Sequence, residues 1–222
     1  MDDFETALAA VVEDIRTRFS DKHSARERAL QLSREVIRHC ANSIRAMHRG
    51  EEERAKELQA EARLLLSDIE EALKGHRDIF YVGYVQDAQK EYAEAVIMRT
   101  VITGQPLPTP RELGVDDAPY LNGMGEAAGE LRRALLDVLR KGDLLRCEYF
   151  LSVMDDIYSF LVTVDYPDAI TGGLRRTTDM VRGVVERSRG DLTVAARQRD
   201  LEARLLEFES RLGGGNSGES RP

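Results

Sequence analysis

Residues 77–103 read RDIFYVGYVQDAQKEYAEAVIMRTVIT, and the rest of the chain is organised around this segment. Its apolar residues occur nearly all round the helix that it predicts, and a helix of that kind lies at the centre of its fold. Three acids, Asp87, Glu91 and Glu94, follow one another at spacings of four and three residues and therefore share one face. Like charges at this spacing destabilise an isolated helix, so we expect a cation beside them.

A second acidic pair, Glu126 and Glu130, lies four residues apart in the segment GEAAGEL at 125–131. Our hypothesis is that the two helices meet and hold a divalent metal between them, as carboxylate-bearing helical bundles do. Mg²⁺ and Mn²⁺ prefer carboxylate oxygens and water. The chain has no Glu-x-x-His motif, which argues against a di-iron centre of the ferritin kind. A site made only of carboxylates suits Mg²⁺-assisted phosphoryl chemistry.

The same acids also have an ordinary explanation, because acidic pairs at this spacing are common on solvated helix faces. In that case they are paired with nearby basic side chains, namely Lys90, Arg99, Arg132 and Arg133. Three glycines in the second segment, Gly123, Gly125 and Gly129, lower its helix propensity. We interpret them as points of close approach for a neighbouring helix or a substrate backbone. Spacing alone leaves both explanations of the acids open.

Composition and periodicity predict an all-α fold of about seven helices. The 222 residues are 42% hydrophobic but only 6% aromatic, without Trp, which favours packed helices over a β-sandwich or barrel. Gly190-Asp191 is expected to begin a separate last helix, whereas Ser20-Asp21 either caps a new helix or kinks a continuous one. The proline-rich segment 104–119 predicts a surface loop rather than a domain boundary. We therefore expect one helical domain over residues 1–212 and a disordered Gly/Ser-rich tail over 213–222.

The net charge of −8 argues against a generally basic, nucleic-acid-coating surface, although it leaves room for a local basic site. Residues 22–49 carry such a candidate, a helix face rich in arginine. This face is either solvated and paired with its own acids or a strip that contacts phosphates. The first residues lack the pattern of a signal peptide, and no apolar run approaches the length of a membrane span. We expect a soluble, cytoplasmic protein.

Several short segments resemble the translin family, especially translin-associated factor X and the archaeal members. They are EYAEA at 91–95, YLNGM at 120–124, GELRR at 129–133, RERALQLSREV at 26–36, LRRTTD at 174–179 and GDL at 190–192. The resemblance covers about residues 22–208 in order. No single motif is diagnostic, but the series together is fairly specific.

This resemblance implies an all-helical protomer that assembles into a closed, hollow oligomer, a homo-octamer or one with a second, diverged subunit. It also implies a Mg²⁺-dependent endoribonuclease, with Mn²⁺ as the other candidate metal, acting on single-stranded RNA inside the shell. By position, the catalytic acids fall on Glu91, Glu94 and Glu126, and Glu130 is a fourth metal ligand. The family's catalytic subunit usually has Asp at the place of Glu126, and the extra methylene puts the geometry of octahedral Mg²⁺ in question.

The candidates for RNA contact are Arg34, Arg38, His76 and Arg77, each of which has a surface ion-pair role as its alternative. Two other functions remain open for the whole chain. One is a non-catalytic shell that binds single-stranded DNA or RNA, as translin does. The other is a purely structural helical assembly whose acids are only solvated.

Overall fold

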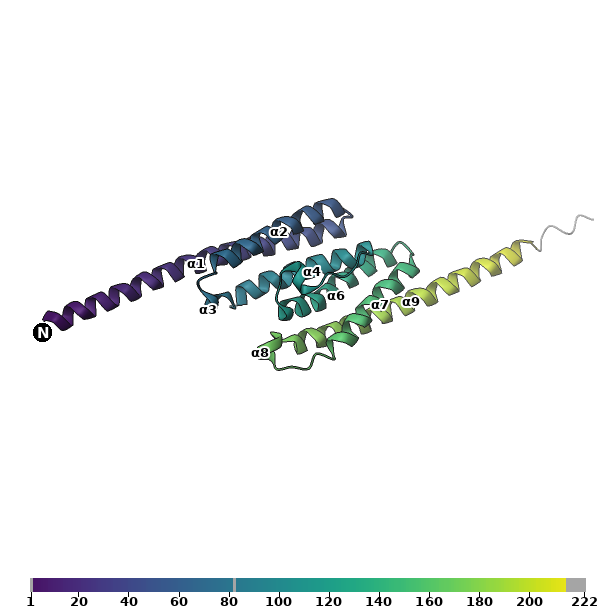
Figure 1. Cartoon of the computed structure of the whole chain (residues 1–222). Coiled ribbons are helices and arrows are strands. Elements are labelled where there is room, and N and C mark those ends of the chain that lie inside the picture. The colour runs from purple at the N-terminus through teal and green to yellow at the C-terminus, as the bar shows by residue number, and fades with distance from the viewer. Residues whose placement is uncertain (1, 82, 215–222) are drawn as a thin grey trace, which may run out of the picture.

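A computed structural model describes residues 2–81 and 83–214, and in that part of the chain all regular structure is helical. Figure 1 shows the order of the elements. The helices are α1 (Asp2–His48), α2 (Glu52–Ala72), α3 (Arg77–Phe80), α4 (Gly83–Thr103), α5 (Pro110–Leu113), α6 (Asp117–Leu139), α7 (Leu144–Leu161), α8 (Asp168–Thr171) and α9 (Leu174–Gly214). The all-α prediction is confirmed.

The acid-bearing helices α4 and α6 lie in the middle of the assembly of helices (Figure 1). α1 packs along α2, both contact α4, α4 packs on α6, and α6 contacts α7 and α9. Two clusters of buried apolar residues result, one including Val36 and Ile97 and the other including Leu131 and Met154. Met124 of α6 packs against both clusters. The core is therefore continuous across the α4–α6 contact.

α4 buries side chains around most of its circumference, as its sequence predicts. Its buried residues include Tyr92 on one turn and Ile97 and Met98 on the next. Glu94 is buried among them, with 8% of its surface exposed. The expected helix over 77–103 is divided into α3 and α4, and α4 begins at Gly83, a residue of low helix propensity.

Two helices are longer than the sequence pattern suggests. α1 continues without interruption through Ser20 and Asp21, and α9 continues through Gly190. The prediction of a separate last helix that begins at Gly190 is therefore wrong. A glycine inside a helix costs only about 1 kcal/mol relative to alanine, which the continuous hydrogen-bonded backbone outweighs here. The helix count rises above seven because α3, α5 and α8 have four residues each. Residues 215–222 of the expected tail lie outside the described residues.

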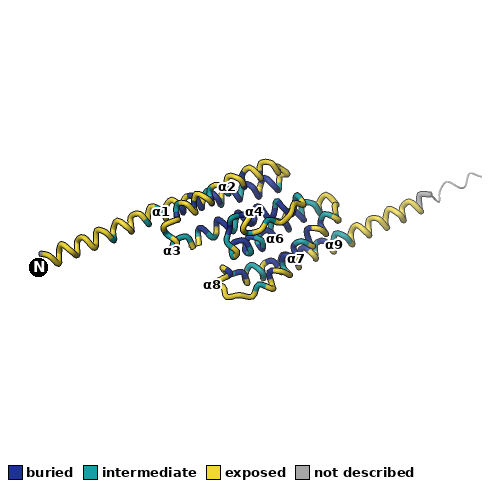
Figure 2. The backbone as a smooth tube through the Cα atoms, viewed as in Figure 1, coloured by how far each residue is buried: buried dark blue, intermediate teal, exposed yellow. Residues whose placement is uncertain are grey.

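The free ends of α1 and α9 project from the packed helices in opposite directions (Figure 2). Both carry exposed apolar side chains at helical spacing. In α1 these include Phe4, Leu8 and Val11, and in α9 they include Leu201 and Leu205. A helix that presents an apolar stripe to solvent has a face that is suited to packing against another element.

None of the described helices combines the length and the apolar composition that crossing a membrane requires.

The contact between α4 and α6 depends on a glycine. A Cβ atom on Gly123 would lie 2.5 Å from the backbone oxygen of Lys90 and 2.9 Å from the Cβ of Ala93. A Cβ on Gly125 would lie 2.3 Å from the Cγ2 of Thr177 in α9, whereas one on Gly129 would meet nothing within 4 Å. The interpretation of these glycines as close-approach points is confirmed for Gly123 and Gly125 as helix contacts. Gly129 makes no such helix contact, and close approach of a substrate backbone there stays a prediction.

These distances predict opposite effects for two alanine substitutions in α6. Gly123→Ala pushes α6 against the backbone of α4 and lowers the free energy of unfolding by roughly 1–3 kcal/mol, as overpacking does. Gly129→Ala has free space and raises this free energy by up to about 1 kcal/mol through helix propensity. Urea unfolding of both variants measures the difference. Equal stabilities would show that the helices are not in close contact at Gly123.

Candidate metal centre

The crossing of α4 and α6 brings three of the expected acids together. Glu91 and Glu94 of α4 and Glu126 of α6 each offer one carboxylate oxygen, and the three oxygens lie within 4.8 Å of one another. We call these residues the acid triad. Gly123 lies three residues before Glu126, so the site is about one turn from the closest contact of the helices. The prediction that the two acidic segments meet is confirmed.

Burial and mutual repulsion make the acid triad electrostatically unfavourable by itself. Burial raises the pKa of Glu94 to about 8, and the nearby charges of Glu91, Glu126 and Glu130 add to this effect. Burial also raises the pKa of Glu91, followed by the charge of Glu126. The carboxylates of Glu91 and Glu94 accept no hydrogen bond from any described residue. A cation at this place would relieve both the repulsion and the missing hydrogen bonds.

Lys90 is the cation that the chain itself supplies. Its Nζ donates a 2.8 Å hydrogen bond to Oε1 of Glu126 across the two helices. Burial acts to lower the pKa of Lys90, but this hydrogen bond and the charges of Glu126, Glu91 and Asp87 outweigh burial and raise it. The sequence alone suggests Lys90 only as a surface ion-pair partner of the acids. It is in fact half-buried inside the site.

The acid triad fits a hard divalent cation. An octahedral Mg²⁺ ion with ligands at about 2.1 Å keeps its oxygens at most about 4.2 Å apart. The separation limit of 4.8 Å is close to this value, and small rotations of the glutamate side chains would close the difference. With all three acids ionised, Lys90 leaves the triad with a net charge of about −2, which a divalent cation would balance.

Glu130, the fourth expected ligand, is directed to another partner. Its Oε2 lies 2.5 Å from Nε2 of His48 in α1 and 3.9 Å from Nη1 of Arg133. The hydrogen bond to His48 holds the pKa of Glu130 below its usual range, with help from the charges of His48 and Arg133. The side chain of His48 is only 6% exposed, so this contact fastens the end of α1 to α6. The role of Glu130 as a metal ligand stays a prediction.

Asp87 shares a helix face with Glu91 but is not part of the acid triad. It is exposed, one turn before Glu91, and its charge acts on both Lys90 and Glu91. Its position is that of a group at the outer edge of the site.

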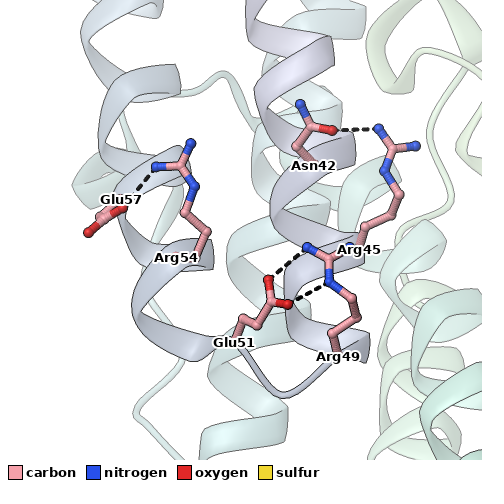
Figure 3. Close-up of polar contacts among 6 residues, drawn as sticks. All are labelled: Asn42, Arg45, Arg49, Glu51, Arg54 and Glu57. Carbon is pink, nitrogen blue, oxygen red and sulfur yellow. Dashed lines mark hydrogen bonds and ion pairs between the residues drawn. The ribbon is translucent and has the colours of Figure 1, made fainter.

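The arginines of α1 differ in their availability. Figure 3 shows that Arg49 forms two hydrogen bonds of 2.7 Å with Glu51 and that Arg45 donates to Asn42 at 2.6 Å. Arg34 and Arg38, one turn apart, are exposed and pair with no described residue. The arginine face is therefore partly self-paired. Arg28, Arg34 and Arg38 are exposed without a described partner, and two of them are the residues predicted from the sequence to contact RNA.

The other two candidates for RNA contact lie at the start of α3. His76 is the half-buried N-cap residue of this helix, and Arg77 is exposed in its first turn. The described hydrogen bonds and ion pairs do not connect either residue with the acid triad. Their role in RNA contact stays a prediction.

Comparison with known proteins supports the class of protein that this fold and site suggest. No protein-family model matches the chain. An uncharacterized protein of Methanocaldococcus jannaschii is 30% identical over 195 residues, which cover 86% of this chain and 85% of that protein. The chain is also similar to AfC3PO in two solved structures, each with a TM-score of 0.78 and coverage of 85% of this chain. One is a complex with duplex RNA, 34% identical over 97% of that chain, and the other is 33% identical over 98%.

A third structure, apo-NeC3PO, is 21% identical, covers 83% of this chain and 96% of that chain, and has a TM-score of 0.75. This likeness shows the fold alone. Together the comparisons define an all-helical protein of the C3PO type. The chain belongs to the translin family and is similar to its archaeal members, which confirms the family that the sequence segments indicated.

The raised pKa of Glu94 predicts how stability depends on pH in metal-free protein. The folded-state pKa of about 8 exceeds the ordinary value of 4.5. The folded state therefore keeps a proton that the unfolded chain releases, and the associated stability is fully present below pH 4.5 and is lost as pH rises through 8. Glu94→Gln should remove this loss and exceed wild type by a few kcal/mol at pH 9, since one pKa unit corresponds to about 1.4 kcal/mol.

Urea unfolding in the presence of a chelator, at a series of pH values from 5 to 9, measures this difference. Glu70→Gln, which changes an exposed acid on α2 outside the acid triad, is the matched control and should keep the wild-type pH dependence. A Glu94→Gln variant with the same pH dependence as wild type would contradict the burial of an uncompensated carboxylate.

Proposed function

We propose that this protein is a Mg²⁺-dependent endoribonuclease that acts on single-stranded RNA inside an oligomeric shell, with Mn²⁺ as the other candidate metal. The observation that carries the proposal is the acid triad itself. Two helices, with a proline-rich segment between them in the chain, bring Glu91, Glu94 and Glu126 within 4.8 Å. These positions match the catalytic acids of the family that the chain resembles. The complex of AfC3PO with duplex RNA supports an RNA ligand.

In this mechanism Glu91, Glu94 and Glu126 hold the cation. A divalent cation bound there supplies Lewis-acid polarisation of a phosphoryl oxygen. Glu94 must lose its proton to act as a ligand, so its raised pKa makes occupancy of the site dependent on pH. Lys90 fixes the carboxylate of Glu126, and His48 fixes that of Glu130 one turn further along α6. Lys90 of α4 and His48 of α1 thus orient the two carboxylates of α6 from different helices.

Arg34 and Arg38 are proposed to contact the RNA backbone, because they are exposed cations without a partner on α1. His76 and Arg77 are proposed as a second basic group. An acidic protein can bind RNA in this way if its free cations face the bound strand.

We also propose that residues 1–212 form one domain and that protomers assemble into a closed shell, with a homo-octamer as the leading candidate. The exposed apolar stripes on the free ends of α1 and α9 support self-association, since they have no partner within the described chain. Such stripes at helical spacing are typical of faces that pack on another helix. Enclosure would place the catalytic acids beside a confined strand.

One observation favours a second function, a non-catalytic shell that binds single-stranded RNA or DNA. Lys90 already occupies one oxygen of Glu126, and Glu126 replaces the Asp that is usual in the family's catalytic subunit. With Lys90 at this place, Glu126 has one oxygen left for a metal ion, and if the ion is too weakly held there, binding without cleavage results. Measured cleavage separates the two functions.

Cleavage of an end-labelled single-stranded oligoribonucleotide in Mg²⁺ tests the proposal. Glu91→Ala and Glu126→Ala should each reduce the rate by more than the roughly 10–100-fold that removal of outer-shell partners costs. Glu126→Asp restores the family's usual acid and should retain cleavage. Glu70→Ala, an exposed acid on α2, is the control and should cleave as wild type does. Cleavage that survives both alanine substitutions would remove the acid triad from the reaction.

A duplex of the same sequence, tested in parallel, addresses the kind of strand. The proposal expects slower cleavage of the duplex, whereas faster cleavage would make duplex RNA the substrate. Metal-independent binding without any turnover in Mg²⁺ or Mn²⁺ would favour the non-catalytic shell.

A further inference from the structure

We propose that the cleft between α4, α6 and the first turn of α9 binds the nucleotide next to the scissile phosphate, and that Arg176 contacts the backbone phosphate of this nucleotide. The inference rests on the proposed function, since it takes the acid triad as the place of cleavage. It adds a subsite that extends the triad toward α9.

The cleft adjoins the acid triad directly. It has a volume of about 580 Å³, and both Lys90 and Glu126 line it. This volume is in the range of small-molecule and cofactor pockets, about 300–1,000 Å³, so one nucleotide unit can enter. A strand whose phosphate reaches the triad therefore has space for its next residue on this side.

Two glycines directly before α9 line the cleft, and because they have no side chains they leave this wall open. Gly172 and Gly173 have φ angles of +61° and +85°, a region that favours glycine. A Cβ on Gly173 would meet nothing within 4 Å. The backbone is thus exposed to an entering ligand at this point.

A buried asparagine holds this wall in place. Nδ2 of Asn122 donates to the backbone oxygens of Ala118, at 2.9 Å, and Thr171, at 2.8 Å. Its Oδ1 accepts a 2.6 Å hydrogen bond from Oγ1 of Thr177. These bonds connect α6 with α8 and α9, and Asn122 is buried. The cleft is therefore preformed rather than dependent on a ligand for its shape.

Charge distribution assigns the phosphate to Arg176. Lys90 is already bonded to Glu126, and Asp87 adds a second acid on the α4 side. Arg176 is exposed and pairs with no described residue, so it is the cation of the cleft that is free for an anion. It also lies in the first turn of α9, where the helix dipole is positive and opposes a cation unless an anion binds there. A phosphate bound at Arg176 would pair with this cation and with the positive end of the helix dipole. It would also be kept from repulsion by the acids on the α4 side.

The chain offers a matched control for this assignment. Arg175 is the preceding residue, equally exposed, and without a described partner. It lines a different cleft, together with the acids Asp165, Asp168 and Asp179. Arg175→Gln and Arg176→Gln therefore change the net charge equally but alter different surfaces.

The test measures binding of a single-stranded oligoribonucleotide to the full chain, in Ca²⁺ in place of Mg²⁺, at several salt concentrations. Arg176→Gln should weaken binding about tenfold and reduce the slope of log K against log salt by about 0.7, the value for one phosphate contact on a single strand. Arg175→Gln should leave the affinity within twofold of wild type and the salt slope unchanged. Mn²⁺ binding to the protein alone should be the same in all three proteins.

Wild-type affinity and salt slope in Arg176→Gln would overturn the inference, as would equal losses in the two variants. These outcomes differ from failure of the proposed function. In that case wild type binds no RNA, or it binds RNA and Glu126→Ala leaves cleavage in Mg²⁺ unchanged. Wild-type protein that binds no RNA would overturn the subsite as well.

Discussion

The close contact of α4 and α6 at Gly123 fixes how the two central helices pack and where their acids meet. The backbone oxygen of Lys90 and the Cβ of Ala93 lie where any larger side chain at position 123 would have to go. This approach joins the two apolar clusters into one core and sets the distance between the acids that the helices carry. The fold thereby forces Glu126 toward Glu91 and Glu94, although all three would repel one another as free anions.

The structure offsets this repulsion only in part. Lys90 neutralises Glu126, and His48 takes Glu130 out of the cluster by a hydrogen bond of 2.5 Å. Glu94 has no such partner, and burial and its acidic neighbours raise its pKa to about 8. An arrangement of this kind is unfavourable for stability alone, and carboxylates with strongly shifted pKa values are characteristic of functional sites. Binding of a cation would convert the unfavourable arrangement into a stable one.

Part of this site could be predicted from the sequence, because part of it is local. The i,i+3 spacing puts Glu91 and Glu94 on one face whatever the rest of the chain does, and the apolar pattern of 77–103 predicts a central helix. The acid spacing also suggested that this helix meets the segment of Glu126, and the family resemblance strengthened that hypothesis. The contact of His48 with Glu130 joins residues 82 positions apart and leaves no local signal. Lys90 had a signal, being one of five lysines in the chain and lying inside the acidic stretch. The continuity of α9 was missed since one Gly-Asp pair is a weak terminator.

A crystal soaked in Mn²⁺ distinguishes a metal centre from a cluster of buried acids, because anomalous scattering locates the ion independently of any activity. We expect one strong anomalous peak between the carboxylates of Glu91, Glu94 and Glu126, at about 2.0–2.2 Å from an oxygen of each. Lys90 can keep its 2.8 Å hydrogen bond to one oxygen of Glu126 while the other oxygen binds the ion. Full Mn²⁺ exposure at pH 8.5 with no peak between the three carboxylates would contradict the presence of a metal centre.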